Sequence, residues 1–126
     1  MSCVFCHIDP KTIWAEHGEA LAIFDVFPVT AGHTLVIPRR HVPSYFDLTG
    51  DERQDLWNLV DEVCRQLQAK HAPDGFNIGI NIGKAAGQTI DHLHVHVIPR
   101  YEGDVADPTG GVRGVIPAKQ NYRTRS

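Results

Sequence analysis

The chain has 126 residues, of which 42% are hydrophobic and 21% charged, and its formal net charge is −3. This length predicts a single domain with its own core, over residues 1–126. The slightly acidic balance excludes the basic surplus typical of nucleic-acid-binding proteins. The N-terminus lacks a signal-peptide pattern and no apolar run is long enough to span a bilayer, so we expect a cytoplasmic protein without a membrane partner.

Two regions near the N-terminus predict β-structure. Residues 13–17 and 20–24 flank the Gly18-Glu19 dipeptide, which is the pattern of a hairpin. Residues 33–38, HTLVIP, are apolar and β-branched, and predict a third strand.

Residues 51–71 predict the one long helix of the chain. Thr49 and Glu52 have the spacing of a capping box, in which each side chain satisfies a free backbone N–H group at a helix start. Apolar residues then recur at helical spacing and define one buried face. Cys64 lies on that face, so we interpret it as a core residue.

The second half of the chain predicts two more strands. Residues 76–83, FNIGINIG, alternate strictly and place Asn81 on the polar face. Residues 92–99 form the last predicted strand, and the chain beyond Arg100 is expected to be loop. Strands grouped around one long helix indicate the α+β class with an antiparallel sheet.

Three histidines, His92, His94 and His96, alternate with apolar residues in the last predicted strand. Because side chains alternate across a strand, the three imidazoles are expected on one face, about 6.5 to 7 Å apart. Two of them could bind a catalytic metal. Alternatively, one neutral imidazole attacks phosphorus as a nucleophile while its neighbours orient it.

The segment before the histidines favours nucleophilic chemistry. The loop 83–87, which ends at Gly87, is flexible, and its backbone N–H groups can face an anion. Gln88 and Thr89 follow and supply an amide and a hydroxyl. These neutral donors suit a phosphate or a leaving group and are poor metal ligands.

The stretch GQTIDHLHVHVIPR resembles the signature of the histidine triad (HIT) family, and FDVFPVTAGHTLVIPRRH resembles the same family's upstream segment. The resemblance extends from Cys3 to about Tyr101. It implies a HIT-like fold, with a five-stranded antiparallel sheet and one long and one short helix, paired as a homodimer. It also implies hydrolysis or transfer of a nucleoside monophosphate from a purine nucleotide conjugate, without a catalytic cofactor.

The resemblance implies roles for individual residues. His94 would attack the α-phosphorus, and His96 would hydrogen-bond the phosphoryl oxygens. Thr89 and Gln88 would assist the leaving group and hold the phosphate, while His33 would buttress the site. The nucleotide would meet Asp25 at the ribose, Asn81 and Gly87 near the phosphate, and Phe5, Ile8, Ile23, Phe24 and Val26 around the base. By residue type alone, the alternative for Asp25 is a turn residue, and several of the apolar residues are equally plausible as core.

Cys3 and Cys6 have the C-x-x-C spacing of zinc ligands, which alone supplies two ligands. The resemblance to the zinc-carrying, prokaryotic-type branch of the family implies that His41 and His92 complete a structural Zn²⁺ site. Four protein ligands leave no open coordination position, so this metal is not expected to be catalytic. A reduced pair of thiols without metal, or His7 as a substitute ligand, are the alternatives.

The tail, residues 110–126, lacks the Trp-containing ending of the family's phosphoramidase branch, and by the resemblance it contributes to substrate choice. HVIPR is nearer to the dinucleoside-polyphosphate hydrolase branch. Arg113, Lys119 and Arg123 are either polyphosphate contacts or solvated charges. We therefore predict a hydrolase of dinucleoside polyphosphates or adenosine phosphoramidates that forms a nucleotidyl-His94 intermediate. The rival hypotheses are a metal-dependent phosphohydrolase with His94 and His96 as ligands, and a nucleotide-binding regulatory protein with little turnover.

Overall fold

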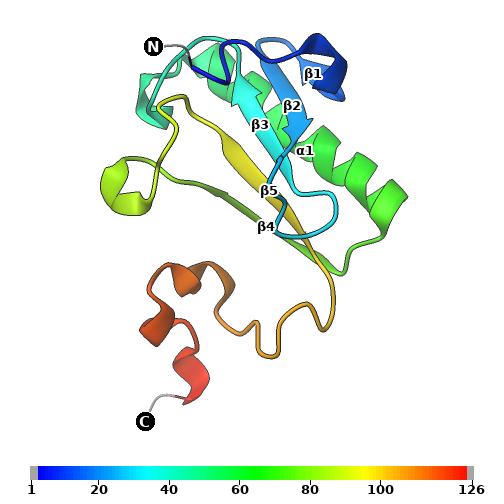
Figure 1. The fold of residues 1–126 in the computed structure, drawn as a ribbon, viewed down its shortest axis with the longest axis vertical. Coiled ribbons are helices and arrows are strands. Elements are labelled where there is room, and N and C mark those ends of the chain that lie inside the picture. Colours follow the sequence, from blue (N-terminus) through cyan, green and yellow to red (C-terminus); the bar gives the residue numbers. More distant parts are fainter. Residues whose placement is uncertain (1–2, 125–126) are drawn as a thin grey trace.

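A computed structural model describes residues 3–124, which form one antiparallel sheet with a long helix packed across one face (Figure 1). The strands follow the order β1-β2-β3-β5-β4. Their bounds are β1 Ala15–His17, β2 Ala20–Phe24, β3 Thr34–Pro38, β4 Gly75–Ile80 and β5 Val95–Arg100, and the helix α1 is Gly50–His71. The remaining helical elements are short 3-10 turns: η1 Pro10–Thr12, η2 Tyr45–Asp47, η3 Lys84–Ala86, η4 Gly111–Val115, η5 Pro117–Lys119 and η6 Tyr122–Thr124. The predicted α+β class and five-stranded sheet with one main helix are confirmed.

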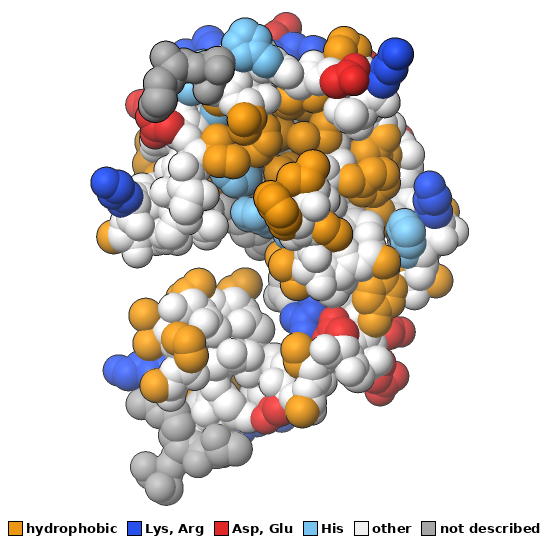
Figure 2. Space-filling view, in the orientation of Figure 1, with side chains coloured by type: hydrophobic (Ala, Val, Ile, Leu, Met, Phe, Trp, Pro, Cys, Tyr) orange, Lys and Arg blue, Asp and Glu red, His pale blue; other side chains and the backbone are white. Residues whose placement is uncertain are grey.

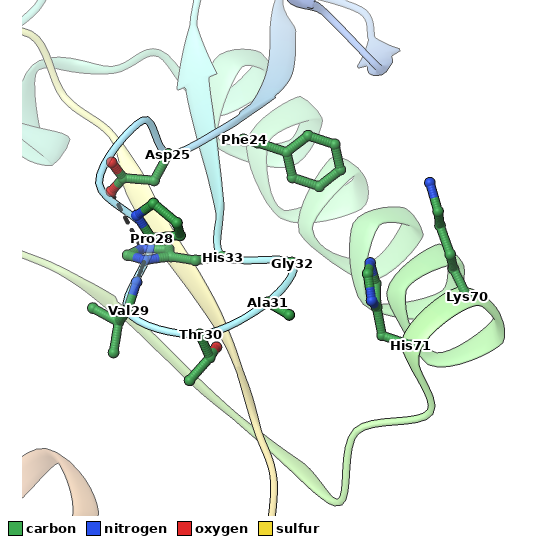
Figure 3. A pocket seen from close by; sticks show the side chains of 10 residues that line it. All are labelled: Phe24, Asp25, Pro28, Val29, Thr30, Ala31, Gly32, His33, Lys70 and His71. Carbon is green, nitrogen blue, oxygen red and sulfur yellow. Dashed lines mark hydrogen bonds and ion pairs between the residues drawn. The ribbon is translucent and has the colours of Figure 1, made fainter. Parts of the chain in front are cut away.

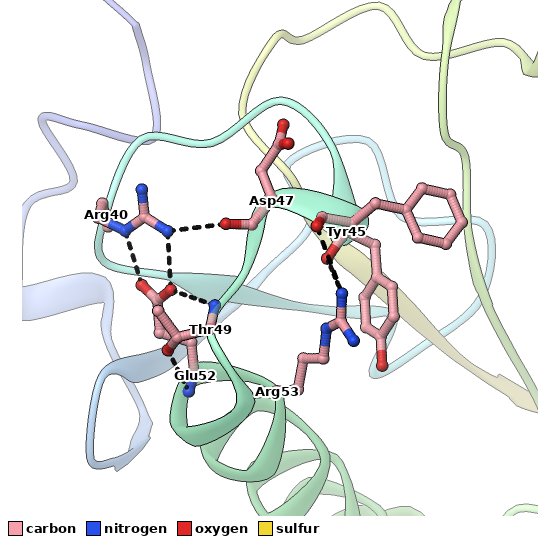
Figure 4. A network of polar contacts seen from close by, with 7 residues as sticks. Arg40, Tyr45, Asp47, Thr49, Glu52 and Arg53 are labelled. Carbon is pink, nitrogen blue, oxygen red and sulfur yellow. Dashed lines mark hydrogen bonds and ion pairs between the residues drawn. The ribbon is translucent and has the colours of Figure 1, made fainter.

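The start of α1 is held by a polar network (Figure 4). The Thr49 hydroxyl accepts from the Glu52 N–H at 3.1 Å, and the Glu52 carboxylate accepts from the Thr49 N–H at 2.8 Å, so the predicted capping box is confirmed. Arg40 donates to both oxygens of Glu52, at 2.9 and 2.8 Å, and to the Asp47 carbonyl at 3.0 Å. The hydrogen bonds from Arg40 make the largest contribution to lowering the pKa of Glu52 to about 2, and the hydrogen bond from the Thr49 N–H makes the next largest. The network ties the helix start to the segment that follows β3.

Two apolar clusters lie on the two faces of the sheet. The larger joins the buried face of α1 to the sheet, and Cys64 packs against its edge, as predicted. Its helical members are Leu56, Leu59, Val60, Val63 and Leu67. The smaller cluster, on the opposite face, consists of Leu21, Leu35 and Ile37, with N-terminal apolar residues packed against it. None of the helices within residues 3–124 has the length and apolar character needed to cross a membrane.

The last strand starts later than the alternating pattern predicted. β5 begins at Val95, so His92 and His94 precede the sheet ladder. The reason is that the Leu93 N–H donates to the Val42 carbonyl at 2.7 Å, outside the sheet. The three imidazoles therefore do not belong to one strand, and His92 is fully buried.

The chain beyond β5 is loop, as predicted, up to residue 110, and it then contains the short 3-10 turns η4, η5 and η6; this tail forms a separate lobe at the far end of the sheet (Figure 1). Arg100 anchors the base of this lobe: it donates to Asn77 at 2.6 Å and to both oxygens of Asp104 at 2.7 Å. Within the lobe, Arg113 donates to the Lys119 carbonyl at 3.0 Å. The Arg113 guanidinium thus holds the fold of the tail.

Candidate active site

A cavity of about 740 Å³ opens on the sheet face opposite α1. The N-terminal segment, the end of β2 with its following loop, and the segment between β4 and β5 form its walls. Figure 2 shows histidine side chains in a hollow framed by hydrophobic side chains. Eleven residues predicted from the sequence line it together: Phe5, Ile8, Ile23, Phe24, Asp25, Val26, Asn81, Gly87, Thr89, His94 and His96.

Several lining residues were missed from the sequence. Among them are His7 and Phe27, which lie in connecting segments without a recognisable pattern, and Leu35 on β3. Leu35 lies on the sheet face opposite α1 and pairs directly with His96. His7, the alternative zinc ligand, lines this cavity and does not belong to the cysteine cluster.

His94 is oriented by a backbone carbonyl. Its Nδ1 lies 2.9 Å from the His92 carbonyl oxygen, and since a carbonyl only accepts, Nδ1 carries the proton. The Phe5 ring meets the His94 imidazole edge-on, with 5.1 Å between ring centroids. The other ring nitrogen, Nε2, has no hydrogen-bond partner within residues 3–124. It therefore presents a lone pair at the cavity.

A series of hydrogen bonds that begins at a backbone N–H fixes which nitrogen of His96 carries the proton. The Val29 N–H donates to His33 Nδ1 at 3.0 Å, so the proton of His33 lies on Nε2. His33 Nε2 then donates to His96 Nδ1 at 3.0 Å, which leaves the proton of His96 on Nε2. Burial lowers the pKa of His33, and burial together with the neighbouring imidazoles lowers the pKa of His96 to about 4. Both imidazole rings are therefore neutral at pH 7, as this series of hydrogen bonds requires.

Asp25 follows β2 and takes part in both the turn and the lining of the cavity. Figure 3, a view of a neighbouring pocket that Asp25 also lines, shows its carboxylate directed toward the His33 ring. One carboxylate oxygen accepts from the Phe27 N–H at 2.9 Å, and the other lies 3.5 Å from His33 Nε2. Next to it, Phe24 stacks on Trp14 with ring centroids 5.1 Å apart. The turn interpretation and the cavity interpretation of Asp25 are therefore compatible.

Asp25, His33 and His96 bring three potential ligand atoms within 4.8 Å of one another. A metal bound there would need lone pairs on both His33 Nε2 and His96 Nδ1, which instead share one proton at 3.0 Å. His33 Nδ1 already accepts from the backbone, so Nε2 cannot lose its proton without producing an imidazolate. This group is a hydrogen-bond network and not a metal site.

Gln88 holds the loop before the histidines and does not line the cavity. Its Nε2 donates to the Pro43 and Ile90 carbonyls, at 2.8 and 3.1 Å, and its Oε1 accepts from the Gly83 N–H at 2.8 Å. These contacts occupy the amide and leave no group to hold a phosphate directly. Thr89, the next residue, does line the cavity.

A second cluster lies beside the active cavity, where four side chains have ligand atoms within 4.8 Å of one another: Cys3, Cys6, His41 and His92. The sulfur of Cys6 lies 3.2 Å from His41 Nδ1 and 3.6 Å from His92 Nδ1, and the Cys3 sulfur lies 3.5 Å from His92 Nδ1. Zinc bonds of about 2.3 Å to sulfur and 2.0 Å to nitrogen give tetrahedron edges of about 3.5 Å, so the spacing fits zinc. His92 Nε2 donates to the Pro38 carbonyl at 2.7 Å, which leaves Nδ1 free for a metal.

Two solved structures similar to this chain are proteins of the histidine triad family. A Zn-bound histidine triad family protein from Mycobacterium smegmatis is 39% identical, with a TM-score of 0.75 over 84% of this chain and 80% of that one. A HIT family protein from Bacillus subtilis is 34% identical, with a TM-score of 0.76 over 82% and 77%. Residues 7–103 match the HIT domain. The chain therefore belongs to the HIT domain family, which confirms the resemblance seen in its sequence.

Two curated relatives illustrate the range of the family. An HIT-like protein from Methanocaldococcus jannaschii is 39% identical over 108 residues, which cover 81% of each chain. The bifunctional bis(5'-adenosyl)-triphosphatase/adenylylsulfatase FHIT from Arabidopsis thaliana is 38% identical over 97 residues, which cover 77% of this chain. The match covers 54% of the Arabidopsis protein, so this chain spans about half of its length.

Proposed function

We propose that this protein hydrolyses nucleotide conjugates at the α-phosphorus, through a nucleotidyl intermediate on His94. The observation that carries the proposal is the His94 tautomer, because the hydrogen bond from Nδ1 to the His92 carbonyl leaves a lone pair on Nε2 at the cavity. The similarity to a bis(5'-adenosyl)-triphosphatase/adenylylsulfatase supports the reaction class. The candidate substrates are dinucleoside polyphosphates and adenosine phosphoramidates.

In the first step, the lone pair of His94 Nε2 forms a bond to phosphorus, and the bond from phosphorus to the leaving atom breaks. The leaving atom keeps the electron pair and takes a proton from solvent, while the Thr89 hydroxyl stabilises it. His96 Nε2–H donates to a phosphoryl oxygen as negative charge grows there. His94 Nδ1 keeps its proton, and the His92 carbonyl stabilises the cationic ring.

In the second step, water attacks the phosphorus and the bond to nitrogen breaks. The electron pair returns to His94 Nε2, a proton of the attacking water passes to solvent, and the nucleoside monophosphate leaves. The intermediate is labile because its cationic ring departs from phosphorus as neutral imidazole, which is a good leaving group. No step requires a metal-bound water.

The nucleoside would lie between the N-terminal segment and the end of β2. Phe5, Ile8 and Ile23 offer an apolar wall for the base, and the Asp25 carboxylate can accept from ribose hydroxyls. An apolar wall discriminates weakly between purines, so the proposed ligand is a purine nucleotide without a stated base preference.

The cysteine–histidine cluster is proposed to hold a structural Zn²⁺. When bound, the metal would fasten the N-terminal segment to His92, whose carbonyl orients His94. We also propose a homodimer in the cytoplasm. The dimer is supported by the edge strand β4, which leaves one side unpaired within residues 3–124 and whose Ile78 is 38% exposed. The cytoplasmic location is supported by the free thiols, which favour a reducing compartment.

Rapid-quench mass spectrometry with an adenosine phosphoramidate tests the mechanism. We expect an added nucleotidyl mass on the peptide that contains His94. His94→Ala should retain nucleotide binding and lose turnover by about 10⁴-fold or more, as loss of a covalent nucleophile does. His17→Ala, at an exposed imidazole outside the cavity, is the matched control. Activity of His94→Ala within tenfold of wild type, or complete loss of activity after chelation of free divalent metal alone, would contradict the proposal.

A further inference from the structure

Cys3 and Cys6 lie at the two ends of one turn in the N-terminal segment. The Cys6 N–H donates to the Cys3 carbonyl at 3.0 Å, and a turn closed in this way brings its end Cα atoms to within about 7 Å. Both sulfurs lie on one side of the turn, because they are 3.5 and 3.6 Å from His92 Nδ1 and within 4.8 Å of one another. A disulfide spans Cα atoms that are about 4.4 to 6.8 Å apart. The pair is therefore placed to form a disulfide without movement of a strand or helix.

An oxidant in solution can reach this pair of thiols. The Cys6 side chain is exposed and the Cys3 side chain is half-buried. The third cysteine, Cys64, packs against the core between α1 and the sheet and is not a member of the cysteine–histidine cluster. The two thiols that lie together, and not Cys64, are therefore the pair that an oxidant would join.

Phe5 connects this pair to the active cavity. It lies between the two cysteines in the turn, and its ring lines the cavity. The ring centroid is 5.1 Å from that of His94 and 5.9 Å from that of His92, edge-on in both cases. A disulfide draws its two sulfurs to about 2.05 Å from one another, which tightens the turn around Phe5. The change at the cysteines therefore reaches a side chain that contacts His94.

The two sulfurs are also half of the four potential zinc ligands. Because the thiolate is the form that binds a metal, an oxidised pair leaves His41 and His92 alone, and two ligands do not make a structural site. The His92 carbonyl is the group that orients His94, at 2.9 Å from its Nδ1. Oxidation of the pair thus alters two neighbours of His94 at once, the Phe5 ring and His92.

We propose that Cys3 and Cys6 form a reversible disulfide when the protein meets hydrogen peroxide, and that this disulfide lowers the activity of the adjoining site. Disulfides in a reducing compartment are typically transient and redox-sensing, which fits an exposed pair of neighbouring thiols. The loss of activity rests on the proposed function, whereas the formation of the disulfide does not.

The oxidation is balanced with peroxide as the only oxidant. One sulfur, as a thiolate, attacks a peroxide oxygen, the O–O bond breaks, and a sulfenic acid forms together with hydroxide, which takes up a proton to become water. The second thiolate attacks the oxidised sulfur, the S–S bond forms, and the S–O bond breaks as a second hydroxide leaves and is protonated. The two thiols lose two electrons and two protons, and the peroxide is reduced to two waters. A small thiol such as glutathione reverses the reaction by thiol–disulfide exchange.

Treatment of the zinc-loaded full chain with hydrogen peroxide, followed by alkylation, trypsin and mass spectrometry, tests the disulfide. Cleavage after Lys11 keeps Cys3 and Cys6 in one peptide. We expect this peptide to lose two hydrogen atoms and to resist alkylation, while Cys64 remains alkylated. A chromogenic chelator should detect zinc release in step with the loss of thiols. Dithiothreitol and added zinc should restore the starting state.

Three further measurements test the effect on the site. We expect kcat/KM for an adenosine phosphoramidate to fall about tenfold or more on oxidation, because small displacements of reacting groups cost up to about 10² in rate. The disulfide form should also be less active than the reduced chain stripped of metal, a comparison that separates the tightened turn from simple loss of zinc. The NMR resonances of the Phe5 and His94 rings should shift between these two forms, whether or not the protein turns over substrate.

Cys64→Ser is the matched control and should respond to peroxide as wild type does. Cys3→Ser and Cys6→Ser each leave one thiol in the turn and should form no disulfide in this peptide. The proposal is wrong if Cys64 is oxidised as fast as the pair, if the pair links two chains or passes to sulfinic acid, or if the disulfide leaves the Phe5 and His94 resonances unchanged. An unchanged kcat/KM in the disulfide form would refute the regulation alone. If the reduced protein hydrolyses no phosphoramidate, the proposed function and the regulation of its activity fail together, and the thiol, zinc and NMR measurements still decide whether the disulfide forms and reaches His94.

Discussion

The hydrogen-bond chain from Val29 through His33 to His96 can be cut at either link. His33→Asn keeps an oxygen near the position of Nδ1, so it can accept from the Val29 N–H, but it has no donor that reaches His96. His33→Gln places an amide N–H near the position of Nε2, so it keeps the donation to His96 and gives up the backbone link. Comparison of the two variants separates control of the His96 tautomer from simple loss of the imidazole.

The expected sizes follow from the geometry. Each link is an ordinary neutral hydrogen bond of 3.0 Å, and such a bond contributes about 1 kcal/mol, a bias of about fivefold in tautomer population. We therefore expect His33→Asn to reduce kcat/KM about five- to tenfold and His33→Gln to stay within about threefold of wild type. His96→Ala, which removes the donor itself, should cost about 10² to 10³. Because His33 is 3% exposed, each His33 variant should also lose about 1–3 kcal/mol of unfolding free energy.

The assay measures initial rates of nucleoside monophosphate release from an adenosine phosphoramidate, with calorimetry to compare stability and ¹⁵N NMR to locate the His96 proton. Wild type and His33→Gln should carry that proton on Nε2, and His33→Asn should show a mixture. The reasoning would be refuted if His33→Asn and His33→Gln, at matched stability, lost kcat/KM equally. It would also be refuted if His96 in the wild-type protein carried its proton on Nδ1.

Three further predictions concern stability and metal content. Burial holds the His96 pKa at about 4 against an ordinary 6.5, so the unfolded chain binds more protons between these values. The stability contributed by neutral His96 is therefore complete above pH 6.5 and falls by about 3 kcal/mol as the pH drops toward 4. In urea unfolding, the advantage of wild type over His96→Asn should shrink in that window, and a constant difference would argue against it. The pKa of Glu52 is lowered to about 2 from 4.5, so its contribution is present above pH 4.5 and is lost as the pH falls toward 2. At pH 7, Glu52→Gln should cost about 1–2 kcal/mol in thermal unfolding, and Glu62→Gln, which breaks an exposed pair with Arg65, less than about 0.5 kcal/mol. Elemental analysis should find about one zinc per chain in wild type and Cys64→Ser, and a large loss with a lower Tm in Cys6→Ser. Wild type purified without metal and with an unchanged Tm would speak against the structural zinc.

Local patterns in the sequence were sufficient to place the regular elements. The helix agrees with its prediction to within one residue, because the capping box at Thr49 and Glu52 and the apolar periodicity act over a few neighbouring residues. The hairpin of β1 and β2 forms around Gly18 for the same reason. Resemblance to the family supplied the rest of the site, including His41 as a companion to the two cysteines.

The proton positions on the histidines, the orientation of Gln88 and the start of β5 came from tertiary structure alone. His96 has its proton on Nε2 because of a backbone N–H at Val29, and Gln88 turns away from the cavity because of the carbonyl of Pro43. The His33–His96 pair and the Gln88–Pro43 pair are 63 and 45 residues apart in the sequence, and no periodic pattern encodes such contacts. These contacts form only in the complete fold, because the remaining interactions of the fold must offset the entropy that is lost when these long loops close. The start of β5 is decided in the same way, since the Val42 carbonyl takes the N–H that would otherwise extend the strand toward His92.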